Sequence, residues 1–533
     1  MSIVAAVGAL PESVQNLIPY IATTAALWVA WRVWRFTIAP ALNPDSPKPL
    51  PYLVPGESQT LHRRKAIFFL TPLVVGHVVG MSKNAGKVFT YGREYFGNTR
   101  EIFSLTVMGE EMYIVTSPAD VLAVYKESTK IDFDAIVKGI MGDFGCTDVT
   151  ISKMFERDGA SKHWMDLCHD DFKLQMHPGN RLEVLQNTFL GNIDRSLAWD
   201  RIAGPMIVSS TSDSKTISLW KWCGAVLVDS ATRAFFGDAI YRVSPTIVSD
   251  FFPFDEEAWK LPYRYPVFAA KTMYTYKRKG EQAFTAYLAL PKTSRADASW
   301  IVDKMEHGMH KMGITDPAQC AAMLFTLHRL VNSNAYRLCF WCLSHLLFTP
   351  SLLATILDEI TPAFNRDTNT LDLPYLLDHC PQLASFYEEI LRVANDPIGA
   401  RVVAEKVTVG GKTLLPGRKL LMPYKQLHFN PAVFGSNAGE FDAKRFLNNK
   451  GLLRSTSWRP FGGAATHCPG RFLARREVYM FLALVLLRFD VKLAKAGDGK
   501  EQRFPRLDES IPSGGVLAPV PGDDVFVEVR ERG

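Results

Sequence analysis

The amino-acid sequence predicts a mainly helical domain with a small β part, preceded by one N-terminal transmembrane helix. Helical patterns of apolar residues dominate from about 150 to 395 and return from about 469 to 488. Short strand-like runs, separated by glycine and proline turns, occur at 101–115, at 401–422 and at the C-terminal end. An uncharged stretch near the N-terminus predicts the first helix.

The composition is that of a folded, mildly basic protein. The 533 residues are 47% hydrophobic and 21% charged, which argues against wholesale disorder. Lys and Arg number 60 and Asp and Glu 54, so the net charge is +6, and the lack of a long basic run predicts no nucleic-acid partner. The eight cysteines are sparse, which argues against a disulfide scaffold and favours a reducing compartment.

The uncharged segment predicts a membrane anchor over residues 14–38. Residues 14–31 carry no charge, and at 1.5 Å each they form a helix of about 27 Å. Tryptophans near its end, followed by Arg32 and Arg35, are typical of a membrane interface. Residues 1–13 hold no Lys or Arg, so the positive-inside rule places them in the lumen and the large remainder in the cytosol. A cleaved signal peptide and a buried core helix are the alternatives.

A stiff linker and a single large domain are predicted to follow the anchor. Residues 39–56 contain six prolines, which predicts a spacer that is not helical. The apolar stretch 66–80 is short for a span and predicts a surface segment in contact with lipid. Residues 57–533 show no repeat and no internal linker, so they predict one domain. Its first elements are two short strands joined at Gly109 and a helix over 118–126.

A long helix is predicted in the middle of the chain. Asp316 is a good N-cap, and Pro317 fits the first helical turn. The apolar pattern continues to Phe348, and about 30 residues would span roughly 45 Å. Only the polar run Asn332-Ser333-Asn334 interrupts it.

The most informative segment is WRPFGGAATHCPGR, at 458–471. A glycine-rich loop leads to Cys468, and Pro469 stands at a natural first position of the apolar helix that follows. At such a helix start, free backbone N–H groups and the helix dipole favour a thiolate, which suits a soft axial bond to iron. Gly462 and Gly463 would let the backbone approach a flat ligand closely.

This segment resembles the haem-binding loop of the cytochrome P450 family, and in particular of fungal microsomal members. Phe461, Cys468 and Gly470 match the family's pattern. Ala464 stands where the family usually has glycine, and Thr466 stands where a basic residue usually meets a haem propionate. The resemblance implies the cytochrome P450 fold over the whole chain. It also implies haem b as the cofactor, with the Cys468 thiolate as the axial ligand of its iron.

Two further motifs stand in the family's order. Glu389 and Arg392, in PQLASFYEEILRVA, match a Glu-x-x-Arg motif, and they lie one helical turn apart. Arg445, in EFDAKRFL, resembles the second arginine of the same cluster, although Ala and Lys precede it where the family has Pro and Glu. The resemblance implies that these three residues support the proximal side of the cofactor, and that Arg401 binds a haem propionate.

The resemblance also assigns a distal side. Asn334 stands at the family's acid position and Ala335 at its threonine position, as in the branch of sterol and bile-acid hydroxylases and prostacyclin synthase. Because Ala335 has no hydroxyl, Ser333, a water or the substrate would supply the proton, or the chemistry is not oxygen activation. Alternatively, the asparagines mark a helix distortion without a chemical role. Residues 395–400 and 514–517 would face the substrate.

The sequence thus predicts a single-pass monooxygenase of the endoplasmic reticulum membrane with a haem-thiolate catalytic domain in the cytosol. A thiolate ligand favours O–O cleavage. The resemblance implies an enzyme that uses O₂ to oxidise an apolar small molecule, such as a terpenoid, sterol or polyketide of secondary metabolism. An NADPH-dependent P450 reductase would supply electrons, with cytochrome b5 left open as a second donor. Arginines around the cysteine loop suit an acidic redox partner: Arg454, Arg459, Arg471, Arg475 and Arg476. The alternatives are a haem-thiolate isomerase or dehydratase acting on a peroxide or alcohol without external electrons, and a non-catalytic haem- or lipid-binding protein.

Overall fold

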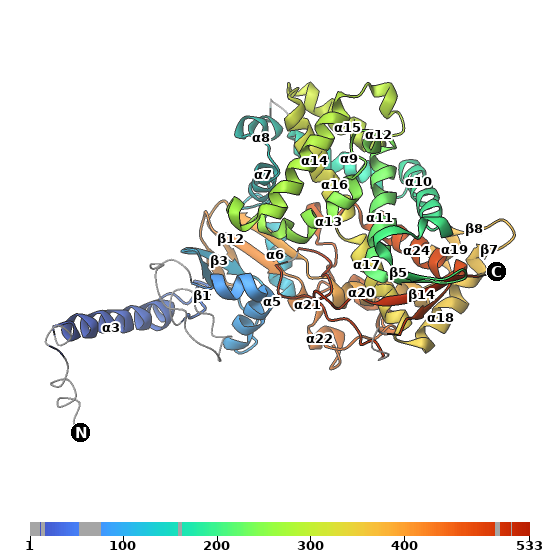
Figure 1. Ribbon diagram of the computed structural model, residues 1–533. Helices are drawn as coiled ribbons and strands as arrows, with labels where there is room; N and C mark the ends of the chain where they lie inside the picture. Colours follow the sequence, from blue (N-terminus) through green and yellow to red (C-terminus); the bar gives the residue numbers. More distant parts are fainter. Residues whose placement is uncertain are drawn as a thin grey trace. The chain divides into compact units, whose positions relative to one another are not determined.

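The predicted fold class, mainly helical with a small β part, is confirmed in the computed structural model (Figure 1). The structure describes residues 11, 16–52, 76–157, 162–495, 501–512 and 514–532. Internal contacts divide the chain into two compact units. The smaller unit comprises Met1–Asp132 and Ala400–Pro423, and the larger comprises Phe133–Gly399 and Tyr424–Gly533.

A six-stranded sheet organises the smaller unit, in the order β1-β2-β3-β12-β9-β4. The sequence correctly predicts β2, β3 and the helix after them, which Ser117 caps by accepting a hydrogen bond from the backbone N–H of Asp120. The unit's elements are β1 (Lys48–Pro49), α5 (Val78–Tyr95), β2 (Phe103–Val107), β3 (Glu110–Ile114), α6 (Pro118–Lys126), β4 (Ile131–Asp132), β9 (Ile398–Val403), β10 (Val407–Val409), β11 (Lys412–Leu414) and β12 (Lys419–Pro423).

The N-terminal helix α3 (Ile18–Val33) has no buried side chain. A π-helical turn, Trp34–Ile38, and α4 (Ala39–Leu42) follow, so the start of the predicted linker is helical. Pro40 lies directly after the π-helical turn in one continuous helical run, so its missing N–H leaves one position of that run without a backbone donor. Parts of the predicted anchor, linker and lipid-contacting segment lie outside the described residues.

Within the part of the chain that the structure describes, no single helix passes the length and hydropathy test for a membrane span. One pair of neighbouring helical segments, Pro317–Leu347 and Pro350–Ala363, passes the test only when the two are taken together. The pair is bent by 113° at the break between them.

Three buried helices form the centre of the larger unit: α11 (Leu219–Phe236), α17 (Ala335–Leu347) and α24 (Arg471–Arg488). Helix α17 packs against both others, and α24 is buried continuously from Glu477 to Leu487, as expected for a helix that is apolar on all sides. The longer helices around them are α7 (Asp134–Asp143), α9 (Trp164–Met176), α10 (Asn180–Ser196), α13 (Ile247–Glu257), α14 (Lys271–Ala289), α15 (Trp300–Lys311), α16 (Pro317–Asn332), α18 (Pro350–Ile360) and α20 (Pro381–Ala394).

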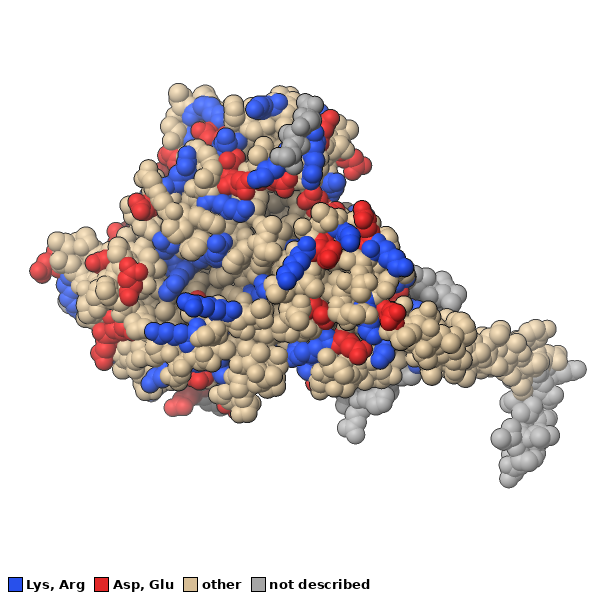
Figure 2. Space-filling view, turned by 180° about the vertical axis from the view of Figure 1, so that it is seen from behind, with Lys and Arg blue, Asp and Glu red and all other residues tan. Residues whose placement is uncertain are grey.

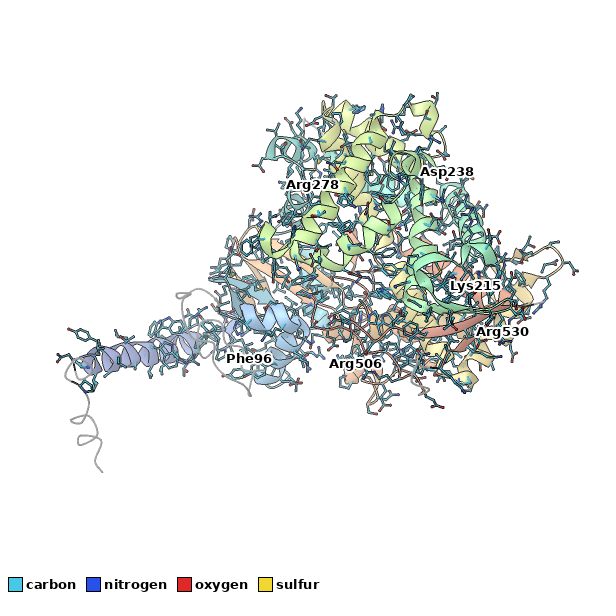
Figure 3. The ribbon with its side chains drawn as sticks, viewed as in Figure 1. Phe96, Lys215, Asp238, Arg278, Arg506 and Arg530 are labelled. Carbon is cyan, nitrogen blue, oxygen red and sulfur yellow. The ribbon has the colours of Figure 1, made fainter. Side chains whose placement is uncertain are left out.

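A four-stranded antiparallel sheet closes one end of this unit, in the order β13 (Phe489–Leu493), β14 (Phe526–Glu531), β6 (Lys215–Ser218) and β5 (Ile207–Ser210). Strands β13 and β14 pair from Phe489↔Glu531 to Leu493↔Val527, which confirms the predicted C-terminal strand. The labelled Lys215 and Arg530 mark this sheet in Figure 3.

The predicted single helix from Asp316 to Phe348 is wrong in one respect, because it is broken in the middle. Asp316 caps α16 by accepting a hydrogen bond from Ala318 N at 2.9 Å, as predicted. The helix ends at Asn332, whose amide donates back to the His328 carbonyl at 2.9 Å, and α17 starts two residues after Ser333. Asparagine and serine side chains compete with the backbone for hydrogen bonds, which explains a break at this polar run.

Candidate active site

Cys468 lies at the end of a tight loop, just before α24 begins at Arg471. The backbone N–H of Cys468 donates to the Phe461 carbonyl at 3.0 Å and closes the loop. Gly462 adopts φ +78°, a conformation that glycine takes without strain. Pro469 precedes the helix instead of opening it, so the predicted start is off by two residues. The Cys468 side chain is exposed, whereas the other seven cysteines are buried.

Two opposing influences act on the pKa of the Cys468 thiol. Desolvation by the crowded protein around the sulfur raises this pKa, although solvent still reaches the side chain. Hydrogen bonds from the backbone of Gly470 and Arg471, and the charge of Arg471, lower it by less. The predicted effect of the helix start is therefore present, but desolvation outweighs it in the chain alone.

Both departures from the family's loop have a visible structural consequence. Ala464 has φ +53°, in the left-handed region where the family's usual glycine is free of strain. The hydroxyl of Thr466 donates to the Gly463 carbonyl at 3.2 Å, so it serves the loop itself. Ala464 therefore strains the loop, and Thr466 reinforces it.

A neighbouring histidine on α9 supports the fit of a porphyrin to this loop. The imidazole of His169 hydrogen-bonds the backbone of Ala465, and burial lowers its pKa, so the ring is neutral at physiological pH. Its Nε2 atom is buried and has no hydrogen-bond partner among the described residues. Since buried polar atoms are nearly always paired, this nitrogen calls for a partner that the described residues do not supply. An accessible cysteine sulfur in the loop, and an unpaired imidazole nitrogen on a side chain bonded to the same loop, together fit a haem with polar side groups.

The predicted Glu389, Arg392 and Arg445 come together in one buried cluster. Arg392 binds both Glu389 carboxylate oxygens, with Nε–Oε2 at 2.8 Å and Nη2–Oε1 at 2.7 Å. Arg445 Nε lies 3.2 Å from each of the same oxygens. Glu389 and Arg392 are wholly buried. Two guanidinium groups face one carboxylate, so the cluster carries one excess positive charge.

Backbone carbonyls compensate the excess charge of this cluster and tie it to the segment before the cysteine loop. Arg392 donates to the carbonyls of Ala438 at 2.6 Å and Glu440 at 2.7 Å. Arg445 donates to the Phe434 carbonyl at 2.6 Å, and the backbone N–H of Asp442 donates to Glu389 at 2.8 Å. The cluster thus fixes α20 to residues 434–445, on the chain path that leads to Cys468.

Several residues that hold the cysteine loop carry no sequence signal. Asn395 donates to the Pro460 carbonyl at 2.9 Å. His428 Nε2 accepts a hydrogen bond from Arg459 N at 3.1 Å, which requires a neutral ring, and burial lowers its pKa to about 3. Trp458 donates from its indole to Glu388 at 3.2 Å. No motif or spacing links these positions, so only the fold could reveal them.

The predicted distal residues lie at the helix break. Asn334 donates from its amide to the Ser333 hydroxyl at 3.3 Å, and its carbonyl oxygen accepts from Val516 N at 2.9 Å. Ala335 is the first residue of α17. The Asn334 carbonyl is therefore occupied by the C-terminal segment, and Ser333 offers the hydroxyl at the break.

Arg401 belongs to the other unit, on β9, where its guanidinium lies 5.3 Å from the centre of the Tyr125 ring. It is buried and donates to the Ala400 carbonyl at 2.7 Å. Its predicted contact with a propionate stays a prediction.

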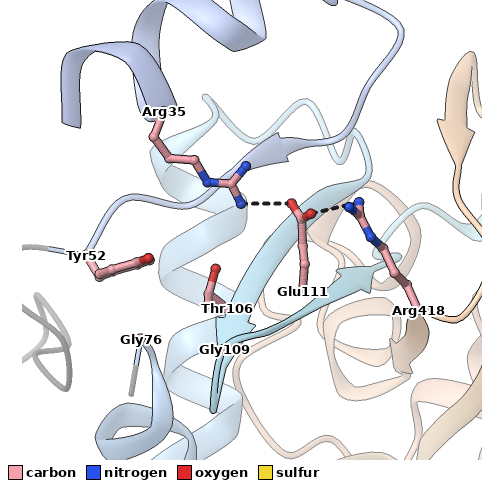
Figure 4. Close-up of a pocket in the computed structure, with 7 residues that line it drawn as sticks. All are labelled: Arg35, Tyr52, Gly76, Thr106, Gly109, Glu111 and Arg418. Atoms are coloured by element: carbon pink, nitrogen blue, oxygen red, sulfur yellow. Dashed lines mark hydrogen bonds and ion pairs between the residues drawn. The ribbon is translucent and has the colours of Figure 1, made fainter. Parts of the chain in front are cut away.

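A polar pocket of about 540 Å³ lies in the smaller unit (Figure 4). Glu111 joins Arg35 at 3.3 Å and Arg418 at 2.7 Å across it, as the dashed lines in Figure 4 show. None of the predicted site residues lines this pocket.

Comparisons with known proteins agree with the motifs. The family model for cytochrome P450 matches residues 338–512. The chain is 23% identical over 489 residues to the cytochrome P450 monooxygenase poxD of Penicillium oxalicum, covering 89% of this chain and 93% of that protein. It is 22% identical over 447 residues to the 7-alpha-hydroxycholest-4-en-3-one 12-alpha-hydroxylase of Oryctolagus cuniculus, covering 79% of this chain and 85% of that enzyme.

A shorter relative gives higher identity. The chain is 31% identical over 153 residues to the cytochrome P450 monooxygenase dtpC of Aspergillus flavus, covering 27% of this chain and 82% of that protein. The family implies a haem iron with a cysteine thiolate ligand, and an accessible cysteine in a tight loop before a buried helix, with a Glu–Arg–Arg cluster beside its chain path, is what such a centre requires. The chain therefore belongs to the cytochrome P450 family, and it is a monooxygenase.

Proposed function

We propose that the protein is a membrane-anchored haem-thiolate monooxygenase that oxidises an apolar small molecule with O₂ and electrons from an NADPH-dependent reductase. The observation that carries the proposal is the placement of Cys468, the only exposed cysteine, in a loop that the protein braces on several sides. A haem iron with a thiolate ligand supplies the activation of dioxygen.

The chain's own residues have distinct tasks in this proposal. Cys468 would be the sulfur ligand, with the backbone N–H groups of Gly470 and Arg471 directed to it. The Glu389–Arg392–Arg445 cluster would keep the proximal segment rigid. His169 would donate to or accept from a polar side group of haem b, and Phe461 would pack beside the ring.

Proton supply on the distal side would fall to Ser333. Ala335 has no hydroxyl, and the Asn334 carbonyl is engaged by Val516. The Ser333 hydroxyl accepts from Asn334, so its own proton stays available for donation.

The relatives support the proposed substrate class. Fungal monooxygenases and a steroid 12-alpha-hydroxylase are among them, which supports a terpenoid, sterol or polyketide substrate of secondary metabolism. The membrane anchor is supported by α3, which exposes large apolar side chains such as Tyr20, Ile21 and Leu27. We propose the endoplasmic reticulum as its membrane, with residues 57–533 in the cytosol.

The redox partner would be a reductase that binds through an acidic surface, and cytochrome b5 would be a second electron donor. Arg454 is exposed close in sequence to the cysteine loop, and Arg471, Arg475 and Arg476 are half-buried at the start of α24. Figure 2 shows Lys and Arg side chains gathered towards the middle of the face seen there. Such a surface attracts an acidic partner and makes electron transfer sensitive to salt.

The first test is the carbon monoxide difference spectrum of reduced membranes that contain the protein, beside a Cys468→Ala control. A red-shifted Soret band that the variant lacks supports thiolate ligation. A band typical of histidine-ligated haem, or no haem at all, contradicts it and favours the non-catalytic protein.

A haem-thiolate isomerase or dehydratase remains the second candidate, and Ala335 is the observation that favours it. The two candidates differ in their need for electrons. Product formation that stops without NADPH or O₂ supports the monooxygenase, whereas turnover of a peroxide or alcohol without either supports the isomerase or dehydratase.

A further inference from the structure

The C-terminal segment Gly515–Leu517 lies against one face of α17. Asn334, Arg337 and Trp341 are spaced three and four residues apart, so their side chains project from the same face. Asn334 Oδ1 accepts from Val516 N at 2.9 Å, Arg337 Nη1 donates to the Val516 carbonyl at 3.2 Å, and the Trp341 indole donates to the Leu517 carbonyl at 2.7 Å. Asn334, at the N-cap of α17, and two side chains of the helix thus bind three backbone groups of Val516 and Leu517.

The other edge of the same segment pairs with the end of α20. Leu517 N donates to the Ala394 carbonyl at 2.9 Å, and Asp396 N donates to the Gly515 carbonyl at 2.9 Å. A Cβ atom at Gly515 would lie 2.2 Å from Asn334 Oδ1, so the close approach depends on glycine. The side chains of Val516 and Leu517 are buried. The segment is therefore held on both edges and has one defined position.

Arg337 has a second partner, which lies on α13. Its Nη2 binds the carboxylate of Asp255, a side chain with no exposed surface. The Tyr336 hydroxyl donates to the same carboxylate oxygen at 3.1 Å, and Arg329 Nη2 lies 3.6 Å from the other oxygen. One guanidinium therefore joins α13, the distal helix and the C-terminal segment.

We propose that Arg337 is a positioning residue that couples α13 to the segment Gly515–Leu517 and thereby sets the shape of the substrate-facing side. The assignment of that side rests on the proposed function, whereas the coupling rests on these contacts alone. Lysine could not replace Arg337, because one ammonium group lacks the planar fork that reaches Asp255 and Val516 together. Loss of the link removes the Arg337 contact of the segment and leaves the bonds to Ala394 and Asp396 on its other edge, beside Asn395, which holds the cysteine loop.

The test uses the full-length chain with its haem and measures hydrogen exchange of a peptide that covers residues 514–518. Arg337→Met is expected to accelerate exchange there by about 5-fold or more, a typical size for coupling between two sites. Asp255→Asn does not touch the segment, yet it is expected to accelerate exchange of the same peptide. The double variant is expected to match Arg337→Met, because both changes break one link.

Arg233→Met is the matched control, since Arg233 also forms ion pairs on a buried helix but contacts Asp229 and Asp238 instead of the segment. It should leave exchange at 514–518 unchanged. Unchanged exchange in Asp255→Asn, or independent effects in the double variant, would overturn the coupling. If Arg337→Met fails to fold, Arg337→Lys takes its place, alone and combined with Asp255→Asn, in the same comparison.

A second readout concerns shape. Imidazole and 4-phenylimidazole bind haem iron and differ in size, so the ratio of their dissociation constants reports the space on the distal side. We expect the ratio to change in Arg337→Met and Asp255→Asn, with imidazole binding itself nearly constant. A constant ratio despite faster exchange would overturn the role in specificity. A chain that binds no haem would refute the proposed function instead, and the exchange experiment would still decide the coupling.

Discussion

Ala464 is one of the few described non-glycine residues whose backbone has a positive φ. It holds a left-handed conformation in the loop that ends at Cys468, and that conformation costs a non-glycine residue roughly 1–2 kcal/mol. The strain is located where the loop must present the sulfur, so the surrounding hydrogen bonds have to maintain it.

Ala464→Gly is therefore expected to stabilise the protein by about 1 kcal/mol, less the entropy that a glycine adds to the unfolded chain. The midpoint of denaturant unfolding measures the change. Ala465→Gly is the matched control: it is next in the sequence, has no positive φ, and should be neutral or destabilising. An equal gain in both variants would show that the strain at Ala464 is not responsible.

A buried carboxyl on α24 makes stability depend on pH. Burial raises the pKa of Glu477 to about 8, whereas in the unfolded chain it titrates near about 4.3. Between these values the folded protein holds a proton that the unfolded chain has released. The stability that Glu477 contributes is thus complete below its pKa in the unfolded chain. It is lost as the pH rises towards its pKa in the folded protein.

Glu477→Gln should remove this loss of stability at higher pH. We expect the variant to gain stability over the parent when the pH rises from about 5 to about 8.5, as followed by unfolding midpoints at each pH. Glu405→Gln, at an exposed position, should show no such trend. A difference between Glu477→Gln and the parent that stays constant with pH would refute the assignment.

Individual site residues differ in how well the sequence predicts them. Cys468, Glu389 and Arg392 have fixed local spacings, and the structure places them as the spacing indicates. Arg445 needed the family resemblance, because 56 positions separate it from Glu389. His428 escaped prediction, and Asn395 was predicted only as part of the substrate-facing segment 395–400. Both hold the cysteine loop through backbone atoms that any sequence has.

Helix α20 depends on the charge of Glu389. Among the described residues, Glu389 is the one carboxylate in ion-pair contact with Arg392 and Arg445, so its removal leaves two buried guanidinium groups with carbonyl oxygens and aromatic rings but no carboxylate. Loss of one partner from a buried ion pair typically costs about 3–5 kcal/mol.

We expect Glu389→Gln to lower the free energy of unfolding by about that amount and to reduce the yield of protein with bound haem. Glu388→Gln, one position earlier on the same helix, provides the comparison. Glu388 accepts a hydrogen bond from Trp458 but pairs with no arginine at salt-bridge distance, so its loss should cost much less. Similar losses in the two variants would argue against a special role of the cluster.

The elements that the sequence predicted best are those with strong local signals. Helix α6 matches its predicted bounds, and β2 and β3 flank the expected glycine turn. For the long helix, the polar run 332–334 predicted a distortion only as an alternative, because both halves continue the same apolar pattern. The contact between Asn334 and Val516, nearly two hundred positions away, left no local pattern to predict it.

For the entire chain, the decisive question is what covers α3. No side chain of α3 is buried, and the proposed partner of its apolar side chains is lipid. Deletion of residues 1–38 should move the protein from a carbonate-resistant membrane fraction to the soluble fraction. Deletion of residues 1–13 alone keeps α3 and should leave the protein in the membrane. Equal behaviour of the two deletions would refute the anchor.

One cysteine of the chain is exposed and seven are buried, so alkylation of the exposed one can report whether haem is bound. Burial shields each of the seven from a reagent and raises its pKa. The pKa of Cys468 is raised as well, so it is the exposure of its sulfur that favours reaction there. At mildly alkaline pH a maleimide should label the haem-free chain once, at Cys468, and should label neither the loaded enzyme nor Cys468→Ala. The stoichiometry of labelling would then count the fraction of molecules that carry cofactor, without any substrate, reductase or spectrum.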